Sequence, residues 1–82
     1  MSAHLRRLSG SDVVRALRHF GFEVVATRGS HAKLRRLSPT SERQTLTIPL
    51  HASLAAGTTQ AIFRQACRYV PEPDLRAFFF TE

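Results

Sequence analysis

The chain has 82 residues, which is enough for one domain, residues 1–82, and leaves no room for a second. Hydrophobic residues make up 43% and charged residues 22%, a composition that excludes wholesale disorder, and no run of about 20 apolar residues could span a membrane. Twelve basic and six acidic side chains give a net charge of +6, so we expect a polyanionic partner: nucleic acid first, an acidic protein second and an anionic membrane third. A basic surface that serves only solubility is the alternative interpretation. The single cysteine and the scattered histidines and carboxylates predict no disulfide, no metal site and no cofactor.

A flexible basic arm is predicted for residues 1–7, followed by a first helix that begins at Ser9. Ser9 and Asp12 have the spacing of a capping box, with Asp in place of the usual Glu. Apolar residues then recur at helical spacing and form one stripe: Val13, Leu17 and Phe20. Gly21 is placed to end the helix in a left-handed conformation, so that Phe22 folds back onto the last turn.

Three strands are predicted next, over residues 22–27, 31–36 and 43–48, and the last two alternate polar and apolar side chains. The links between them are short, which predicts an antiparallel meander. Core-facing residues should oppose core-facing residues, because a slip of one residue turns every side chain to the other face. This rule predicts four pairs: Val24 with Leu34, Ala26 with Ala32, Ala32 with Ile48, and Leu34 with Leu46.

A second helix is predicted after a connector over residues 50–57, with Thr58 or Thr59 as its N-cap. Its apolar stripe consists of Ile62, Ala66 and Tyr69. Arg64 and Arg68 stand four residues apart on this helix, where they either grip a phosphate or face solvent.

Prolines end the second helix, and Asp74 is expected to cap a last short turn with an aromatic end. The order of elements is therefore α-β-β-β-α. It predicts an α+β domain in which both helices cover one face of a three-stranded antiparallel sheet.

The other face of the predicted sheet carries a basic row that the helices cannot cover: His31, Lys33 and Arg35. The row begins beside a predicted three-residue turn, Arg28-Gly29-Ser30, in which Gly29 takes the left-handed conformation. In the same register His51 lies just beyond the residue that opposes His31. Two histidines from separate strands therefore converge on one end of the sheet.

This set of side chains suits metal-independent cleavage of RNA. The 2′-hydroxyl attacks the adjacent phosphorus once a base removes its proton, and an acid then protonates the leaving 5′-oxygen. Histidine serves either role because its ordinary pKa of ~6.5 lies near working pH, and cations stabilise the charge on the phosphorane oxygens. His31 with Lys33 and Arg35 is such a set, and His51 is a candidate second proton carrier. The alternative is that an exposed histidine on a basic sheet only binds or does nothing.

Five short motifs occur in a specific order and spacing, namely Leu8-Ser9-Gly10, Leu17-Arg18-His19-Phe20-Gly21-Phe22, Arg28-Gly29-Ser30-His31, Ile48-Pro49-Leu50-His51, and Gly57-Thr58 before Ile62-Phe63-Arg64-Gln65-Ala66. With these motifs the chain resembles the HicA-type toxins of bacterial toxin–antitoxin pairs, over a core of residues 8–79. The resemblance implies a fold like the double-stranded-RNA-binding domain and a ribonuclease that cleaves mRNA and arrests growth. It also implies that the catalytic histidine is His31.

The resemblance further implies a HicB-like antitoxin that binds the toxin and blocks its site. We expect a cytoplasmic protein, monomeric when free and hetero-oligomeric with its antitoxin. The expected RNA-binding residues are Arg28, Gly29, Ser30, Lys33 and Arg35. Two alternatives stay open: a non-catalytic RNA-binding module on the same fold, and a basic domain whose partner is an acidic protein.

Overall fold

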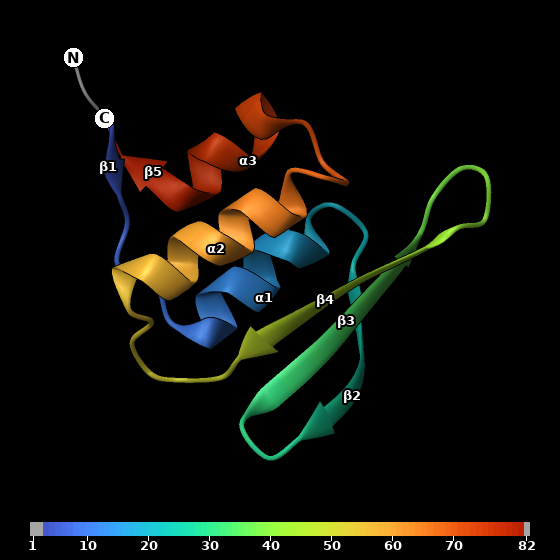
Figure 1. The fold of residues 1–82 in the computed structure, drawn as a ribbon, viewed down its shortest axis with the longest axis horizontal. Helices are drawn as coiled ribbons and strands as arrows, with labels where there is room; N and C mark the ends of the chain where they lie inside the picture. Colours follow the sequence, from blue (N-terminus) through green and yellow to red (C-terminus); the bar gives the residue numbers. More distant parts are fainter. Residues whose placement is uncertain (1–2, 82) are drawn as a thin grey trace.

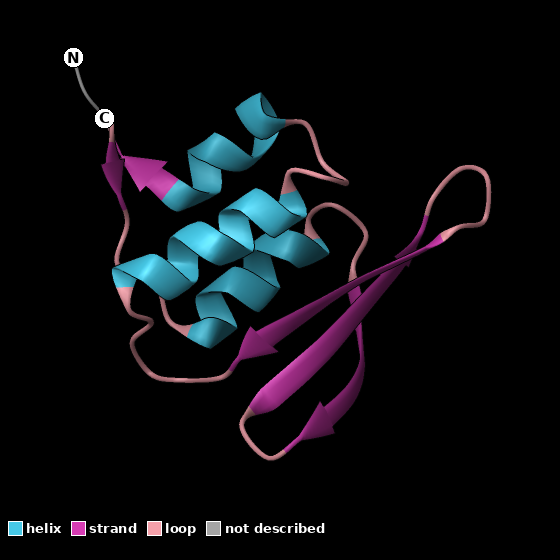
Figure 2. Ribbon diagram, in the orientation of Figure 1, coloured by secondary structure: helices cyan, strands magenta, loops and turns pink. Residues whose placement is uncertain are grey.

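The computed structural model describes residues 3–81, in which the helices lie together on one side of a three-stranded sheet (Figure 1, Figure 2). In chain order the elements are β1 (His4–Leu5), α1 (Gly10–Arg18), β2 (Glu23–Arg28), β3 (His31–Leu37), β4 (Arg43–Pro49), α2 (Ala56–Ala66), α3 (Glu72–Phe79) and β5 (Phe80–Thr81). The predicted α+β order, α-β-β-β-α, is confirmed from α1 to α2. Short elements extend it at both ends.

The limits of α1 follow from its sequence. The Ser9 hydroxyl accepts a hydrogen bond from the Asp12 backbone N–H at 3.0 Å, and the Asp12 carboxylate accepts one from the Ser9 N–H at 2.9 Å. This reciprocal arrangement is the predicted capping box. After the helix, Gly21 has a φ of 90°, and the Phe22 N–H donates to the Leu17 carbonyl at 3.3 Å. Phe22 is thereby turned back into the core, where it is fully buried.

The sheet has the strand order β2-β3-β4 and is antiparallel throughout. Between β3 and β4 the predicted register is confirmed, with Leu34 opposite Leu46 and Ala32 opposite Ile48. The inner face of these two strands packs against the helices. The core consists of Val13, Leu17, Phe22, Ala32, Leu34, Leu46, Ile48, Leu54, Ile62, Phe63, Ala66, Val70, Leu75 and Phe79.

The register between β2 and β3 differs from the prediction near the turn. Val24 opposes Leu34 as predicted, but Ala26 opposes Lys33, and the predicted pair of Ala26 with Ala32 is wrong. The cause is a β-bulge between Val24 and Ala26, which adds one residue to β2 and shifts every pair beyond it. The turn therefore has two residues, Gly29 and Ser30, instead of three.

The N-terminal segment is ordered into the fold, in contrast to the flexible arm predicted for residues 1–7. His4 and Leu5 pair as β1 with Thr81 and Phe80 of β5. The Arg6 backbone N–H then donates to the Phe79 carbonyl at 2.8 Å. This two-stranded ribbon joins the two ends of the chain; Met1 and Ser2 lie outside the described residues.

Both predicted helix caps beyond the sheet are wrong. The second helix begins earlier than expected, at Ala56, and its N-cap residue Ala55 makes no side-chain cap. Thr59 is buried instead, and its hydroxyl donates to the Ala55 carbonyl at 3.3 Å. Pro71 is the N-cap position of α3, an eight-residue helix in place of the short turn, so Asp74 stands in its first turn rather than at its cap.

Candidate functional site

The predicted catalytic histidine begins β3, immediately after the two-residue turn. Gly29, the first turn residue, has a φ of 57°, a conformation that L side chains rarely adopt, as in hairpin turns that take glycine at this position. The turn is tied to the end of β4 because the Leu50 N–H donates to the Ser30 carbonyl. His31 is exposed and stands opposite Arg28 on one side and Pro49 on the other.

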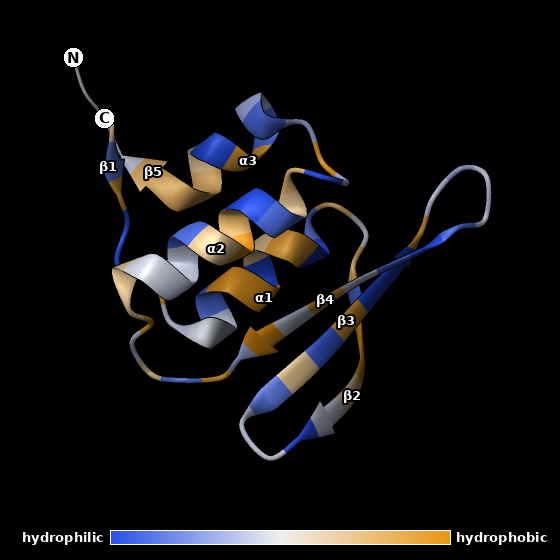
Figure 3. Ribbon diagram, in the orientation of Figure 1, coloured by the Kyte–Doolittle hydropathy of each residue, from blue (hydrophilic) through white to orange (hydrophobic). Residues whose placement is uncertain are grey.

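The outer face of the sheet gathers cations around this histidine. Hydrophilic and hydrophobic residues alternate along β3 (Figure 3), so that His31, Lys33 and Arg35 share the face opposite the buried Ala32 and Leu34. His31 and Lys33 are exposed and Arg35 is half-buried.

The bulge in β2 changes which residue of that strand accompanies His31. Directly opposed residues point to the same face of a sheet, so the shift turns Thr27 inward beside Ala32 and sets Arg28 beside His31. The predicted register had left Arg28 inside the turn. Of the expected RNA-binding residues, Arg28 and Lys33 therefore flank the histidine on the outer face, while Gly29 and Ser30 form the turn next to it.

Arg35 differs from the other members of the row. It stands opposite Glu23, but the Glu23 carboxylate lies 3.7 Å from the guanidinium of Arg18. The Nε of Arg35 is buried and finds no hydrogen-bond partner among residues 3–81. No protein carboxylate therefore neutralises the charge of Arg35 within this part of the chain.

His51 is held by its backbone at the same end of the sheet. Its carbonyl accepts a hydrogen bond from the Gly10 N–H at 2.9 Å, and its side chain is exposed. A Cβ on Gly10 would collide with the Pro49 carbonyl oxygen, so only glycine allows the start of α1 to approach the end of β4 so closely. The approach fixes where His51 leaves the sheet.

The residue that sequence reasoning missed is Arg36, on the inner face of β3. Its guanidinium donates to the Phe20 carbonyl at 2.8 Å, to the Tyr69 carbonyl at 2.7 Å and to the Gln44 side chain at 2.8 Å. It also lies over the Phe22 ring, 5.0 Å from its centroid. Arg36 thus binds the chain just beyond the ends of α1 and α2 to the sheet. The signal was available, since Arg36 follows Leu34 by two residues and so occupies a core-facing position.

The predicted pair of arginines on the second helix is not on one helix face. Arg64 lies in α2, but the helix ends at Ala66, so Arg68 stands in the following turn. Both side chains are exposed, and neither takes part in an ion pair within residues 3–81.

The described residues contain no group of three histidine, cysteine or carboxylate side chains that could hold a metal ion. Over the same residues no helix is both long and apolar enough to cross a membrane.

Comparison with known protein families gives a match to a toxin family. The family model described as the HicA toxin of bacterial toxin–antitoxin matches residues 10–66, from the first residue of α1 to the last residue of α2. The matched segment contains both the hairpin that carries His31 and the Pro49 to His51 step. No curated protein and no solved structure gives a match.

Proposed function

Because the chain belongs to the HicA toxin family of bacterial toxin–antitoxin systems, we propose that it is an endoribonuclease that cleaves mRNA with His31 as its essential proton-transfer residue. The observation that supports this proposal is the position of His31. It stands exposed at a glycine-containing turn, with Arg28 beside it on β2 and Lys33 on its own strand.

In the proposed reaction the 2′-oxygen of RNA forms a bond to the adjacent phosphorus while the bond to the 5′-oxygen breaks. A proton leaves the 2′-hydroxyl and another is delivered to the 5′-oxygen, so the products are a 2′,3′-cyclic phosphate and a 5′-hydroxyl. His31 carries one of these protons. Arg28 and Lys33 stabilise the negative charge that builds on the phosphorane oxygens, and the open outer face leaves room for the sugar–phosphate chain.

The second proton carrier in this scheme is His51 or a water molecule. The side chain of His51 is exposed, and its backbone is fixed two residues beyond Pro49, the residue that opposes His31. If His51 takes part, His51→Gln should remove one limb of the pH–rate profile. A variant with reduced rate but an unchanged profile would show that His51 only orients the connector.

The antitoxin in this proposal is a HicB-like protein with an acidic surface that covers the outer face around His31. The support is charge: residues 1–71 carry eleven basic and three acidic side chains. The free chain is proposed to be a monomer and the inhibited complex a hetero-oligomer.

The direct test incubates the purified chain with a long RNA in EDTA, beside His31→Ala and the control His4→Ala, which removes an exposed histidine from β1. The parent and His4→Ala should both leave 2′,3′-cyclic phosphate ends, and His31→Ala should be slower by about 10²- to 10⁴-fold. Equal rates in all three proteins would exclude His31 as a catalytic residue.

Two other results would decide for the alternatives. Salt-sensitive RNA binding without cleavage by the parent would identify a non-catalytic RNA-binding module. Absence of any salt-sensitive RNA binding would identify a basic domain whose partner is an acidic protein.

A further inference from the structure

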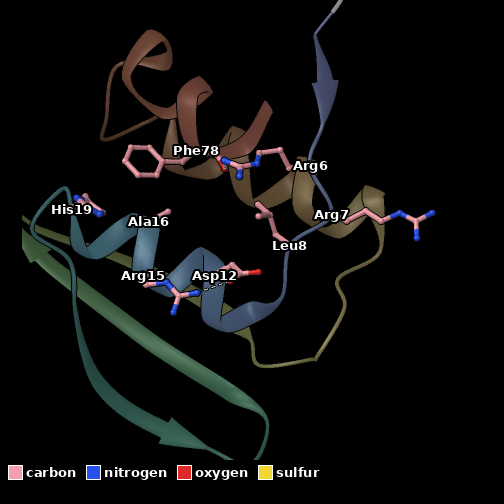
Figure 4. Close-up of a pocket in the computed structure, with 8 residues that line it drawn as sticks. All are labelled: Arg6, Arg7, Leu8, Asp12, Arg15, Ala16, His19 and Phe78. Atoms are coloured by element: carbon pink, nitrogen blue, oxygen red, sulfur yellow. Dashed lines mark hydrogen bonds and ion pairs between the residues drawn. The ribbon is translucent and has the colours of Figure 1, made fainter. Parts of the chain in front are cut away.

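A second basic hollow lies on the side of α1 that faces away from the sheet, between α1, the segment after β1, and α3 (Figure 4). It has a volume of about 330 Å³. The side chains that matter for its chemistry are Arg6, Arg7, Asp12, Arg15, His19 and Phe78. None of them belongs to the site around His31.

The hollow is cationic even with its one carboxylate counted. Three arginines and one aspartate leave a net charge of +2. The Asp12 carboxylate accepts hydrogen bonds from the Ser9 backbone N–H at 2.9 Å and from the Arg15 guanidinium at 2.6 Å, so Asp12 and Arg15 are paired with each other. The Arg6 guanidinium donates to the carbonyls of Ala77 and Phe78 at 3.4 and 3.5 Å. Arg7 is exposed and makes no side-chain hydrogen bond or ion pair within residues 3–81. The hollow therefore offers cationic donors to a ligand that carries negative charge.

One wall of the hollow is aromatic. The His19 ring lies against the Phe78 ring with centroids 5.1 Å apart and planes inclined by 39°. The Phe78 ring also makes an edge-on contact with the Phe20 ring, with centroids 5.4 Å apart, while the His19 side chain is exposed. Surfaces that bind single-stranded nucleic acid combine these two features, with cations along the backbone and aromatic rings on which bases stack. A ligand recognised by charge alone would make no contact that requires the rings.

The hollow shares Arg15 with a groove on the inner side of the β2-β3 hairpin. This arginine also lines a groove of about 260 Å³ between α1 and the sheet, where Thr27 and Ala32 form part of the opposite wall. Thr27 and Ala32 are the chain neighbours of Arg28 and His31. Arg18 lines the same groove, so two arginines of α1 lie between the hollow and the inner face of the hairpin, on the side of the sheet opposite to His31.

From this arrangement we propose that the hollow is a second RNA-contact site, which holds a part of a single-stranded RNA that lies outside the cleaved step. Arg7 and Arg15 bind its phosphates, and the pair of His19 and Phe78 stacks one base. The proposal rests on the proposed nuclease function, and it assigns the hollow to RNA rather than to the antitoxin.

The test measures binding of a labelled, unstructured RNA of mixed sequence to His31→Ala protein. R7Q/R15Q removes two charges from the hollow, and R64Q/R68Q removes two exposed charges from the region of α2 as a matched control. For each phosphate that R7Q/R15Q no longer binds, the affinity should fall about fivefold at 0.1 M salt and the salt slope should flatten by about 0.7. R7K/R15K should keep most of the binding. If R7Q/R15Q and R64Q/R68Q lower the RNA affinity equally, the decrease reflects only the loss of net charge, and the proposal is overturned.

The stacking wall is tested separately with His19→Ser, and His4→Ser serves as its control. His19→Ser should weaken binding of the long RNA about tenfold with an unchanged salt slope. If His19→Ser and His4→Ser bind RNA with the same binding constant, the ring of His19 does not contact the RNA.

A last experiment distinguishes failure of this proposal from failure of the proposed nuclease function. With His31 intact, R7Q/R15Q should cleave a trinucleotide at the parental rate and a long RNA more slowly, because only the long RNA reaches the hollow. Parental rates on both substrates would overturn the second site and leave the nuclease in place. Unchanged RNA binding with weakened binding of an acidic antitoxin would assign the hollow to protein. A parent that neither binds nor cleaves RNA would end both proposals together.

Discussion

The two faces of the sheet hold arginine side chains in different surroundings, and two adjacent arginines of β3 show the difference. Arg36 faces the helices, where three acceptors and an aromatic ring surround its guanidinium. Arg35 faces the open side, and its Nε finds no partner among residues 3–81. Since successive residues of a strand point to opposite faces, one step along β3 separates an arginine whose guanidinium is fully hydrogen-bonded to the fold from one whose buried Nε has no partner among residues 3–81.

The same contrast extends over the two regions. Side chains on the inner face of β3 and β4 are buried against α1 and α2, whereas every residue of β2 is exposed. Strand β2 thus contributes no buried residue to the core, and the outer face of the hairpin carries Arg28, His31 and Lys33, none of which forms an ion pair within residues 3–81. We infer that the stability of the fold comes mainly from the packing of the helices against the inner face of the sheet. The proposed chemistry takes place on the outer face of the hairpin.

The largest expected effect on stability follows from removing the Arg36 guanidinium. Arg36→Met keeps an apolar stem but removes the hydrogen bonds to the carbonyls of Phe20 and Tyr69, which lie beyond the ends of α1 and α2. Hydrogen bonds to charged groups contribute about 1.5–3 kcal/mol each, so the free energy of unfolding should fall by about 3 kcal/mol or more. Urea unfolding monitored by circular dichroism measures this change in the free energy of unfolding.

Arg35→Met is the matched control for this change. It removes the same group one residue away, where the Nε makes no hydrogen bond to any of residues 3–81, and should alter the free energy of unfolding by less than about 1 kcal/mol. It should instead weaken RNA binding. Equal destabilisation by the two variants would contradict the contrast between the faces.

The strand registers show which parts of the sheet can be predicted from the sequence and which cannot. The β3–β4 register was predictable because Ala32, Leu34, Leu46 and Ile48 must all face the core, and a slip would expose them. In β2 no residue is buried, so the alternation that locates a bulge is absent, and the place of Arg28 beside His31 could not be derived.

Elsewhere, tertiary contacts decided against local preferences. Thr59 is a good N-cap residue, but it is buried within α2 instead. Residues 3–7 are rich in charge and short of apolar periodicity, yet β5 supplies backbone partners for β1. Such long-range pairing leaves no local signal. The candidate site could be placed on the outer face near the turn from the sequence, whereas the hollow beside α3 required the structure.

A smaller effect compares a glycine of the hairpin with a glycine of the helical side. Gly29 and Gly57 both have open space where a Cβ would be added, but only Gly29 has a positive φ. Gly29→Ala should therefore lower the free energy of unfolding by about 1–2 kcal/mol through backbone strain alone. Gly57→Ala, in the first turn of α2, should raise it by about 0.5 kcal/mol. Thermal unfolding of the two variants measures the difference. Shifts of the same sign would show that the turn does not require glycine.

The smallest effect concerns the acid that holds α1 on the helical side. The Ser9 backbone N–H, the Ser9 hydroxyl and Arg15 hold the pKa of Asp12 below its ordinary value of 3.8. A lowered pKa in the folded state means that the charged carboxylate stabilises the fold above pH 3.8, and that this contribution is lost as pH falls through the lowered pKa. Asp12→Asn should therefore be less stable than the parent at neutral pH, with the gap closing in acid. Asp74→Asn keeps the capping box and should not change how the stability of the parent falls in acid. If Asp12→Asn differs from the parent by the same amount at every pH, the carboxylate charge does not stabilise the start of α1, and the cap acts through hydrogen-bond geometry alone.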